Sequence, residues 1–110
     1  MDIDIKTIQK VTVVAISGEL DGRTAPLAQE QIVPLYQPGS KMILDMSQVT
    51  YMSSAGLRLL LLLYRQVSGA QGQIVLVGLS EELQDTMSAT GFLAYFTTCD
   101  TLDAGIAALQ

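Results

Sequence analysis

Short apolar stretches separated by turn residues recur along this chain of 110 residues. In the first, Ile3 and Ile5 alternate with charged residues, as in a strand with one exposed face, and Lys10 marks a tight return. The next, Val11–Ile16, is apolar almost throughout, which is typical of a strand covered on both faces. Three later stretches of this kind predict further strands over 42–44, 74–77 and 95–98.

Between these strands, polar and apolar residues are spaced as in helices. Capping residues predict four helix starts, at 21–24, at Ser53 or Ser54, at Ser80, and at Asp100 or Thr101. Helix-ending residues follow near Pro34, Gly69, Gly91 and Leu109. The order β-β-α-β-α-β-α-β-α predicts an α/β fold, with a mostly parallel mixed sheet, an N-terminal hairpin and about four helices packed on it. With 49% hydrophobic residues, we expect one domain over residues 1–110.

The charge, the hydropathy and the cysteine count indicate which partners and which cellular location to expect. The net charge is −5, and all the cations precede residue 66: Lys6, Lys10, Arg23, Lys41, Arg58 and Arg65. An acidic surface repels phosphate backbones, so we expect no nucleic-acid partner. The longest apolar stretch, 57–64, is interrupted by an arginine and is shorter than the roughly 20 residues of a membrane-spanning helix, which predicts no membrane insertion. A single cysteine, Cys99, and no leader-like N-terminus suggest a cytoplasmic protein.

The residue inventory also argues against catalysis. The chain has no histidine, so no Ser-His-Asp or Cys-His site can be assembled. A zinc site would have only one cysteine and carboxylates as ligands. Ser54 does not lie in a G-x-S-x-G elbow, because Met52 stands where that motif needs glycine. There is no P-loop and no dinucleotide-binding fingerprint. We therefore expect no enzymatic activity, no cofactor and no metal.

The most informative segment is 45–57, which leads from an apolar strand through hydroxyl-bearing residues into a leucine-rich helix. A helix N-terminus offers unpaired N–H groups and a partial positive charge, so a serine there can carry a phosphate without disrupting the fold. Arg58, four residues after Ser54, could reach back to such a phosphate. The alternative is that Ser53 or Ser54 only caps the helix, and that Arg58 is a solvated residue. Likewise, Asp45 and Ser47 could simply end the strand by bonding local backbone.

Leucines at 57 and 59–63 cover several sides of the predicted helix. Burial in the core is the expected role of at least Leu60 and Leu61. A domain of this size cannot cover every face, so an apolar strip beside Ser54 could also dock a partner, or a second copy in a weak homodimer. Met87, Phe92 and Tyr95 are interpreted as packing residues, and Cys99 as a small buried hydrophobe.

The pattern Asp45-x-Ser47-x-Val49-x-Tyr51-Met52-x-Ser54-x-Gly56-Leu57 resembles the signature of STAS domains, specifically the single-domain anti-sigma factor antagonists of bacteria. The likeness extends to 18–21 and to 91–92, and so spans essentially the whole chain. The resemblance implies that a partner serine kinase, often itself an anti-sigma factor, phosphorylates Ser54, and that a PP2C-type phosphatase reverses this. It also implies that the unphosphorylated form binds the anti-sigma factor and frees the sigma factor.

The resemblance further implies a set of partner-binding residues: Asp21, Arg23, Thr24, Tyr51, Ser53, Ser54, Gly56, Leu57 and Arg58. Asp21 has an equally good interpretation as a loop or capping residue. Family members often have aspartate or threonine before the modified serine and a hydroxyl residue after it, whereas this chain has Ser53 and Ala55. Alignment favours Ser54, with Ser53 as the alternative. The competing hypothesis is a constitutive STAS adaptor of a lipid-transport or scaffold complex, and a nucleotide- or lipid-binding module is a weaker third.

Overall fold

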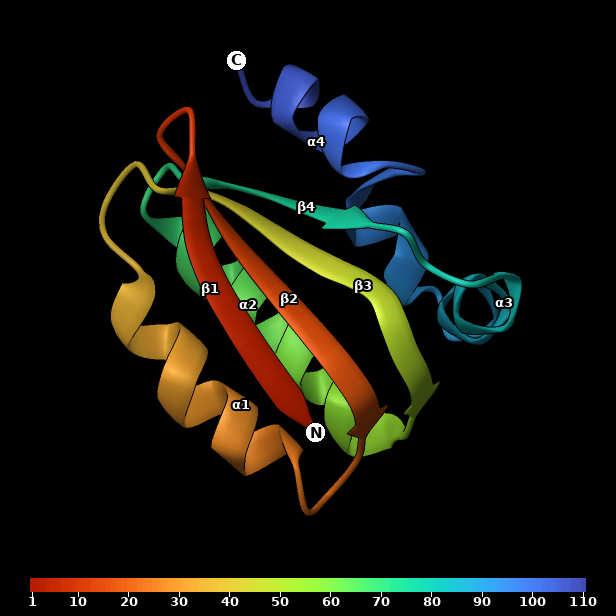
Figure 1. Ribbon diagram of the computed structural model, residues 1–110. Helices are drawn as coiled ribbons and strands as arrows, with labels where there is room; N and C mark the ends of the chain where they lie inside the picture. Colours follow the sequence, from red (N-terminus) through yellow and green to blue (C-terminus); the bar gives the residue numbers. More distant parts are fainter.

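Five strands form one sheet in this computed structural model, which describes residues 1–110. They are β1 (Asp2–Ile8), β2 (Val11–Leu20), β3 (Lys41–Met52), β4 (Gln73–Val77) and β5 (Thr97–Cys99). Their spatial order follows the chain, β1-β2-β3-β4-β5 (Figure 1). The pair β1–β2 is an antiparallel hairpin, and every later pair is parallel. The predicted mixed, mostly parallel sheet with an N-terminal hairpin is confirmed.

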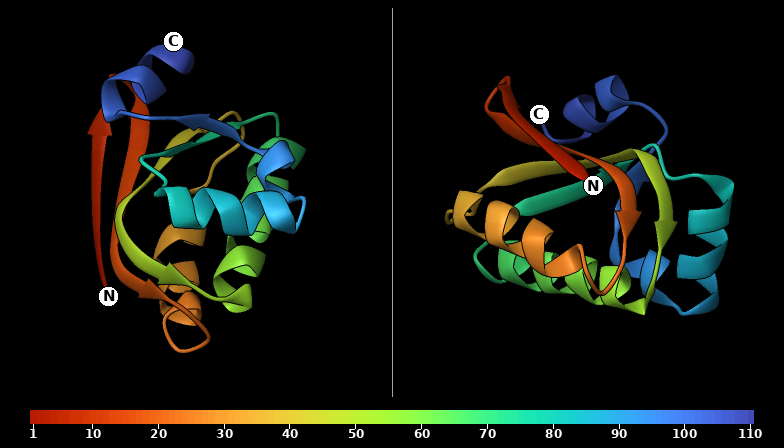
Figure 2. Two further views of the ribbon diagram at one scale, coloured as in Figure 1. Left: turned by 90° about the vertical axis from the view of Figure 1, so that its right-hand side faces the viewer. Right: turned by 60° about the horizontal axis from the view of Figure 1, so that its bottom comes forward.

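Four helices connect and cover the strands. They are α1 (Ala25–Ile32), α2 (Ser54–Gly69), α3 (Glu81–Ala89) and α4 (Leu102–Ala108), with short 3₁₀ turns at Val33–Leu35 and Phe92–Tyr95. Helices α1, α2 and α3 pack on one face of the sheet, and α4 lies on the other (Figure 2). None of these helices combines the length and the hydropathy needed to cross a membrane.

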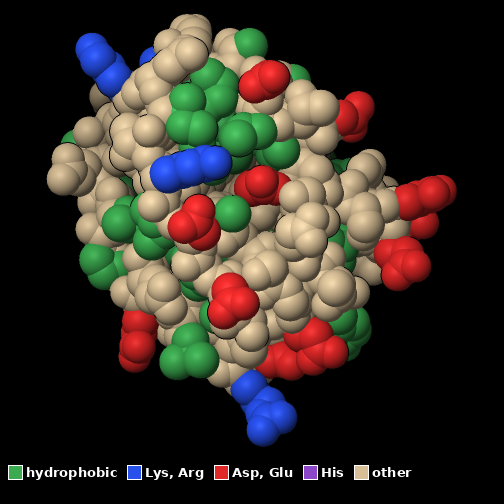
Figure 3. All heavy atoms as spheres, in the orientation of Figure 1, with side chains coloured by type: hydrophobic (Ala, Val, Ile, Leu, Met, Phe, Trp, Pro, Cys, Tyr) green, Lys and Arg blue, Asp and Glu red, His purple; other side chains and the backbone are tan.

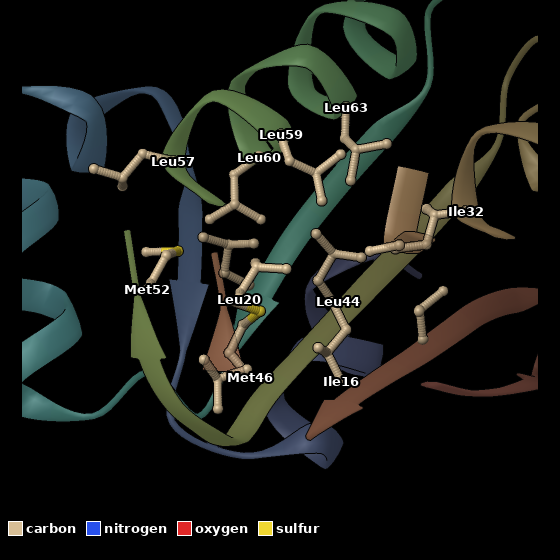
Figure 4. Close-up of a cluster of buried hydrophobic side chains, with 14 of the residues drawn as sticks. Ile16, Leu20, Ile32, Leu44, Met46, Met52, Leu57, Leu59, Leu60 and Leu63 are labelled. Atoms are coloured by element: carbon tan, nitrogen blue, oxygen red, sulfur yellow. The ribbon is translucent and has the colours of Figure 1, made fainter. Parts of the chain in front are cut away.

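The main hydrophobic core lies between the sheet and α1, α2 and α3. In Figure 4, Leu59, Leu60 and Leu63 of α2 point toward apolar side chains of the strands. Leu60 is fully buried, as predicted, whereas Leu61 is only half-buried, so its expected place in the core is wrong. It lies on the side of α2 that turns away from the sheet. A smaller cluster under α4, built around Val13, Ile43 and Ile106, covers part of the opposite face.

Strand β3 is longer than the sequence predicts. The expected strand covered 42–44, but pairing with β2 continues from Thr12↔Met42 to Leu20↔Met52, with register shifts between Ala15 and Ser17 and again between Gly18 and Glu19. Asp45 does accept a local hydrogen bond, from the Ser47 N–H at 3.0 Å, yet the strand does not end there. The serine-rich segment is therefore mostly strand, held by its neighbour β2.

Strand β5, by contrast, starts later and is shorter than the sequence predicts. Tyr95 was expected to begin it, but this residue belongs to the 3₁₀ turn, and β5 covers only Thr97–Cys99. The turn starts at Gly91, whose φ of 79° lies in the left-handed region that suits glycine. Tyr95 is 53% exposed and lies outside the core, to which its neighbours Phe92, Leu93 and Phe96 contribute, but its ring packs against that of Tyr64, with the ring centroids 5.8 Å apart. Cys99, expected to be buried, is half-buried.

Candidate functional site

The two candidate serines take different positions at the start of α2. Ser53 is the N-cap, and its Oγ accepts a hydrogen bond from the Ala55 N–H at 3.2 Å. Its carbonyl oxygen accepts the N–H of Leu57 at 3.1 Å, which closes the first helical turn. Ser54 is the first helical residue and is exposed, whereas Ser53 is half-buried. The capping role and the exposed position, which the sequence left open, thus fall to two adjacent residues.

The loop between β2 and α1 is held by its own side chains. Asp21 Oδ1 accepts hydrogen bonds from the N–H groups of Arg23 at 2.9 Å and Thr24 at 3.2 Å. These backbone donors, that of Arg23 first, hold the pKa of Asp21 below its ordinary value of 3.8. The Thr24 hydroxyl donates to the Glu19 carbonyl at 2.8 Å and accepts from the Asp21 N–H at 2.9 Å. The loop role considered for Asp21 is therefore observed, whereas the N-cap of α1 is Thr24, without a side-chain cap hydrogen bond.

The end of β2, from which this loop begins, contacts the start of α2 directly. The Ser53 N–H donates to the Leu20 carbonyl at 2.9 Å. A Cβ added to Gly56 would lie 2.7 Å from that same carbonyl oxygen and 2.6 Å from Met52 Cγ. Only glycine therefore allows α2 to approach the end of β2 so closely. The contact places the Asp21 loop beside the exposed Ser54.

A shallow groove of about 340 Å³ runs between α1 and the first turns of α2. Its walls combine apolar side chains with one cation, and they are formed by Gly22, Ala25, Pro26, Gln29, Ala55, Arg58, Leu59 and Leu62. The leucine run predicted an apolar strip near Ser54, and Leu62 provides part of it. The α1 wall was missed, because no local pattern shows which helix lies beside α2. The only available signal was the β-α-β connectivity, which places consecutive helices on the same face.

The predicted site residues gather at this end of the sheet, but at different depths. Arg23 and Arg58 are exposed, and Tyr51 is 54% exposed at the end of β3. Gly56 and Leu57 are buried, so they support the surface from beneath. No group of three or more His, Cys, Asp or Glu side chains is placed to hold a metal ion. Over the face seen in Figure 3, acidic side chains outnumber basic ones, in keeping with the net charge.

Comparison with known families agrees with this geometry. The STAS domain family matches residues 2–105. The chain belongs to this family. The anti-sigma-B factor antagonist of Bacillus subtilis is 32% identical over 91 residues, which cover 83% of this chain and 84% of that protein. BtrV of Bordetella bronchiseptica is 26% identical over 111 residues, covering 100% of this chain and 96% of its own length.

Solved structures show the same STAS fold. An anti-sigma factor antagonist from Mycobacterium paratuberculosis superposes with a TM-score of 0.86 at 26% identity, covering 98% of this chain and 92% of that one. The phosphorylated form of the Bacillus cell fate determinant SpoIIAA superposes with a TM-score of 0.75 at 18% identity, covering 99% of this chain and 100% of that one. The names of these relatives describe regulators and not enzymes, in agreement with the prediction that the chain is not an enzyme.

Proposed function

We propose that this STAS protein is an anti-sigma factor antagonist of the cytoplasm, switched by reversible phosphorylation of Ser54. In its unphosphorylated form it binds an anti-sigma factor that is also a serine kinase, and a PP2C-type phosphatase restores that form. The observation that carries the proposal is the exposed hydroxyl of Ser54 at the first position of α2, between the Asp21 loop and the α1–α2 groove. The names of the relatives supply the class of partner.

Ser54 is the better candidate for phosphorylation, because the Ser53 hydroxyl already caps α2. The Ser53 Oγ lies 3.2 Å from the Ala55 N–H and caps the helix, so its modification would disturb a hydrogen bond of the helix start. Ser54 faces solvent and stands outside this cap. A kinase can therefore reach the Ser54 hydroxyl without opening the fold.

A phosphate on Ser54 would change the surface by charge more than by shape. It would bring about −1.5 to −2 charges and three acceptor oxygens to the N-terminus of a 16-residue helix, where the helix dipole favours an anion. Arg58, one turn later, is exposed and close enough along the helix to pair with it. The neighbouring groove walls include Ala55 and Leu62. A partner that desolvates these residues would then meet a phosphate whose charge Arg58 only partly neutralises at the rim of the contact, which opposes binding.

The test is peptide mass spectrometry on the chain purified from its native cells, with and without phosphatase treatment. We expect a phosphate on Ser54 that is absent from Ser54→Ala and still present in Ser53→Ala, the matched control. With the cognate kinase identified, Ser54→Asp should weaken its binding by about 100-fold, or roughly 2.7 kcal/mol, whereas Ser54→Ala should bind as the unmodified chain does. A Ser54 that stays unmodified under every growth condition would contradict the switch and favour a constitutive adaptor of a lipid-transport or scaffold complex.

A further inference from the structure

Strand β1 forms a free edge of the sheet. It is the first strand in the order β1-β2-β3-β4-β5, and Figures 1 and 2 show no other strand along its outer side. Its seven residues, Asp2–Ile8, pair with β2 on the inner side alone. An edge of this length presents a row of unpaired N–H and C=O groups, which is a template for pairing with another strand.

The hairpin determines which backbone groups of β1 point outward. Gln9 and Lys10 form a two-residue turn with φ values of 50° and 69°, and Ile8 pairs with Val11 across it. In such a hairpin the residues that flank the turn exchange both hydrogen bonds, and bonded and non-bonded pairs alternate from there. Residues 8, 6, 4 and 2 therefore bond to β2. The N–H and C=O groups of residues 3, 5 and 7 point away from the sheet.

These outward groups are complementary to those of a second copy of the same strand. When two β1 strands run antiparallel with Ile5 opposite Ile5, residue 3 of each copy faces residue 7 of the other, and all three outward residues can bond. Asp4 of each copy then lies directly opposite Lys6 of the other, so both cross-strand charge pairs are attractive. Moving the centre by one residue would place Asp4 opposite Asp4, or Lys6 opposite Lys6. The charges thus select the register centred on Ile5.

Two exposed apolar side chains lie on the same side of the molecule as this edge. Ile5 is 40% exposed and Leu27 of α1 is 51% exposed. Ile5 shares a sheet face with Ile3, which packs against the core under α1. On α1, Pro26 and Gln29 line the groove toward α2, so helical geometry places Leu27 on the opposite flank, toward β1. Pairing through β1 would cover Ile5 and bring the Leu27 flanks of two α1 helices together.

We propose that this protein forms a two-fold symmetric homodimer by antiparallel pairing of its β1 edges, which joins two sheets into one of ten strands. The two-fold axis stands perpendicular to the sheet, so the α2 N-termini of the two copies lie at opposite ends and both stay accessible. The proposal is independent of phosphorylation. One strand edge and one helix flank make a small interface, so the dissociation constant should be on the order of 100 µM.

Analytical ultracentrifugation over a concentration series tests the dimer and its register together. The wild-type average mass should rise from that of the monomer toward twice that value. Asp4→Lys and Lys6→Asp each create two like-charge pairs across the interface, and each should weaken association at least tenfold. The double variant D4K/K6D restores both pairs with reversed polarity and should return the wild-type dissociation constant. Asp85→Lys and Arg65→Asp make the same charge changes at exposed positions outside β1 and should have no effect.

A disulfide provides a second measurement that does not depend on charge. In a Cys99→Ser background, Ile5→Cys places two thiols on the two-fold axis, where the Cα atoms of a bonded antiparallel pair lie about 5.5 Å apart, within disulfide range. We expect oxidation to link Ile5→Cys chains and to leave Thr7→Cys chains largely unlinked, since residue 7 faces residue 3. Circular dichroism confirms that each variant is folded. Monomer at every concentration, or a dimer that the charge swaps do not weaken and the double variant does not restore, would overturn the proposal.

Discussion

Gly56 is the residue at which α2 closely approaches the end of β2, so its substitution tests how the site is held together. In Gly56→Ala the new methyl group would lie 2.7 Å from the Leu20 carbonyl oxygen, a backbone atom that the Ser53 N–H already holds. Alanine favours a helix over glycine by up to about 1 kcal/mol, but relieving this clash requires the helix and strand to move apart. We expect a net loss of about 1–2 kcal/mol in the free energy of unfolding, measured by urea denaturation.

Gly69 is the matched control within the same helix. Nothing lies within 4 Å of a Cβ added there, and Gly69 is the last residue of α2. Gly69→Ala should leave stability unchanged or raise it by up to about 0.5 kcal/mol. Equal effects at the two positions would show that the close approach at Gly56 does not matter.

The sequence could not separate Ser53 from Ser54, and the reason lies in the strand before them. A helix that begins after an extended segment starts where the strand ends, and here β3 ends at Met52 because Leu20 of β2 pairs with it. That pairing is a long-range contact with no local signal. From the residues alone, capping and phosphorylation were alternative roles for either serine, and only the family alignment favoured Ser54. It took the tertiary structure to assign the two roles.

The β2–α1 loop is the element most sensitive to acid. Backbone N–H groups hold the pKa of Asp21 below 3.8, so the ionised carboxylate stabilises the fold. This contribution is fully present above the ordinary pKa and is lost as the pH falls through the lowered value. Because Asn keeps an acceptor oxygen without the charge, the wild type should be more stable than Asp21→Asn at neutral pH. That difference should shrink as the pH falls below 3.8 in urea denaturation. A difference that grows on acidification would contradict this account.

At the scale of whole elements, periodicity predicted every strand and helix, and it failed at their ends. Strand β3 runs on through Ser47, a residue with a local turn preference, because β2 continues alongside it as far as Leu20. Conversely, Tyr95 has a strand-like composition around it but lies in a 3₁₀ turn, whose Phe96 N–H bonds back to the Leu93 carbonyl. In both places a tertiary or turn hydrogen bond outweighs local propensity. The α1 wall of the groove was missed for another reason, since no local pattern shows which helix lies beside α2.

Across the whole molecule, the candidate site lies on a rigid frame. Three contacts hold the start of α2 in place. Leu57 and Leu60 are buried in the core, and Gly56 packs closely against the end of β2. The Ser53 side chain caps the first turn. Ser54 is the exposed point of this frame. A group added there would not displace buried atoms, which suits a signal that a partner recognises at the surface. A buried serine would have to signal by unfolding part of the core.

We therefore expect phosphoserine at position 54 to leave the backbone nearly unchanged. Amide chemical shifts should move in the loop 20–24 and in 51–58, and stay closely similar in β4 and α4, which lie outside the site. The helix dipole and Arg58 should raise the free energy of unfolding by about 0.5 kcal/mol. Ser54→Gln, which adds bulk without charge, should reproduce neither the size of the local shifts nor the gain in stability. Shifts spread through the core would mean that the switch acts by changing the fold, and the surface mechanism would have to be abandoned.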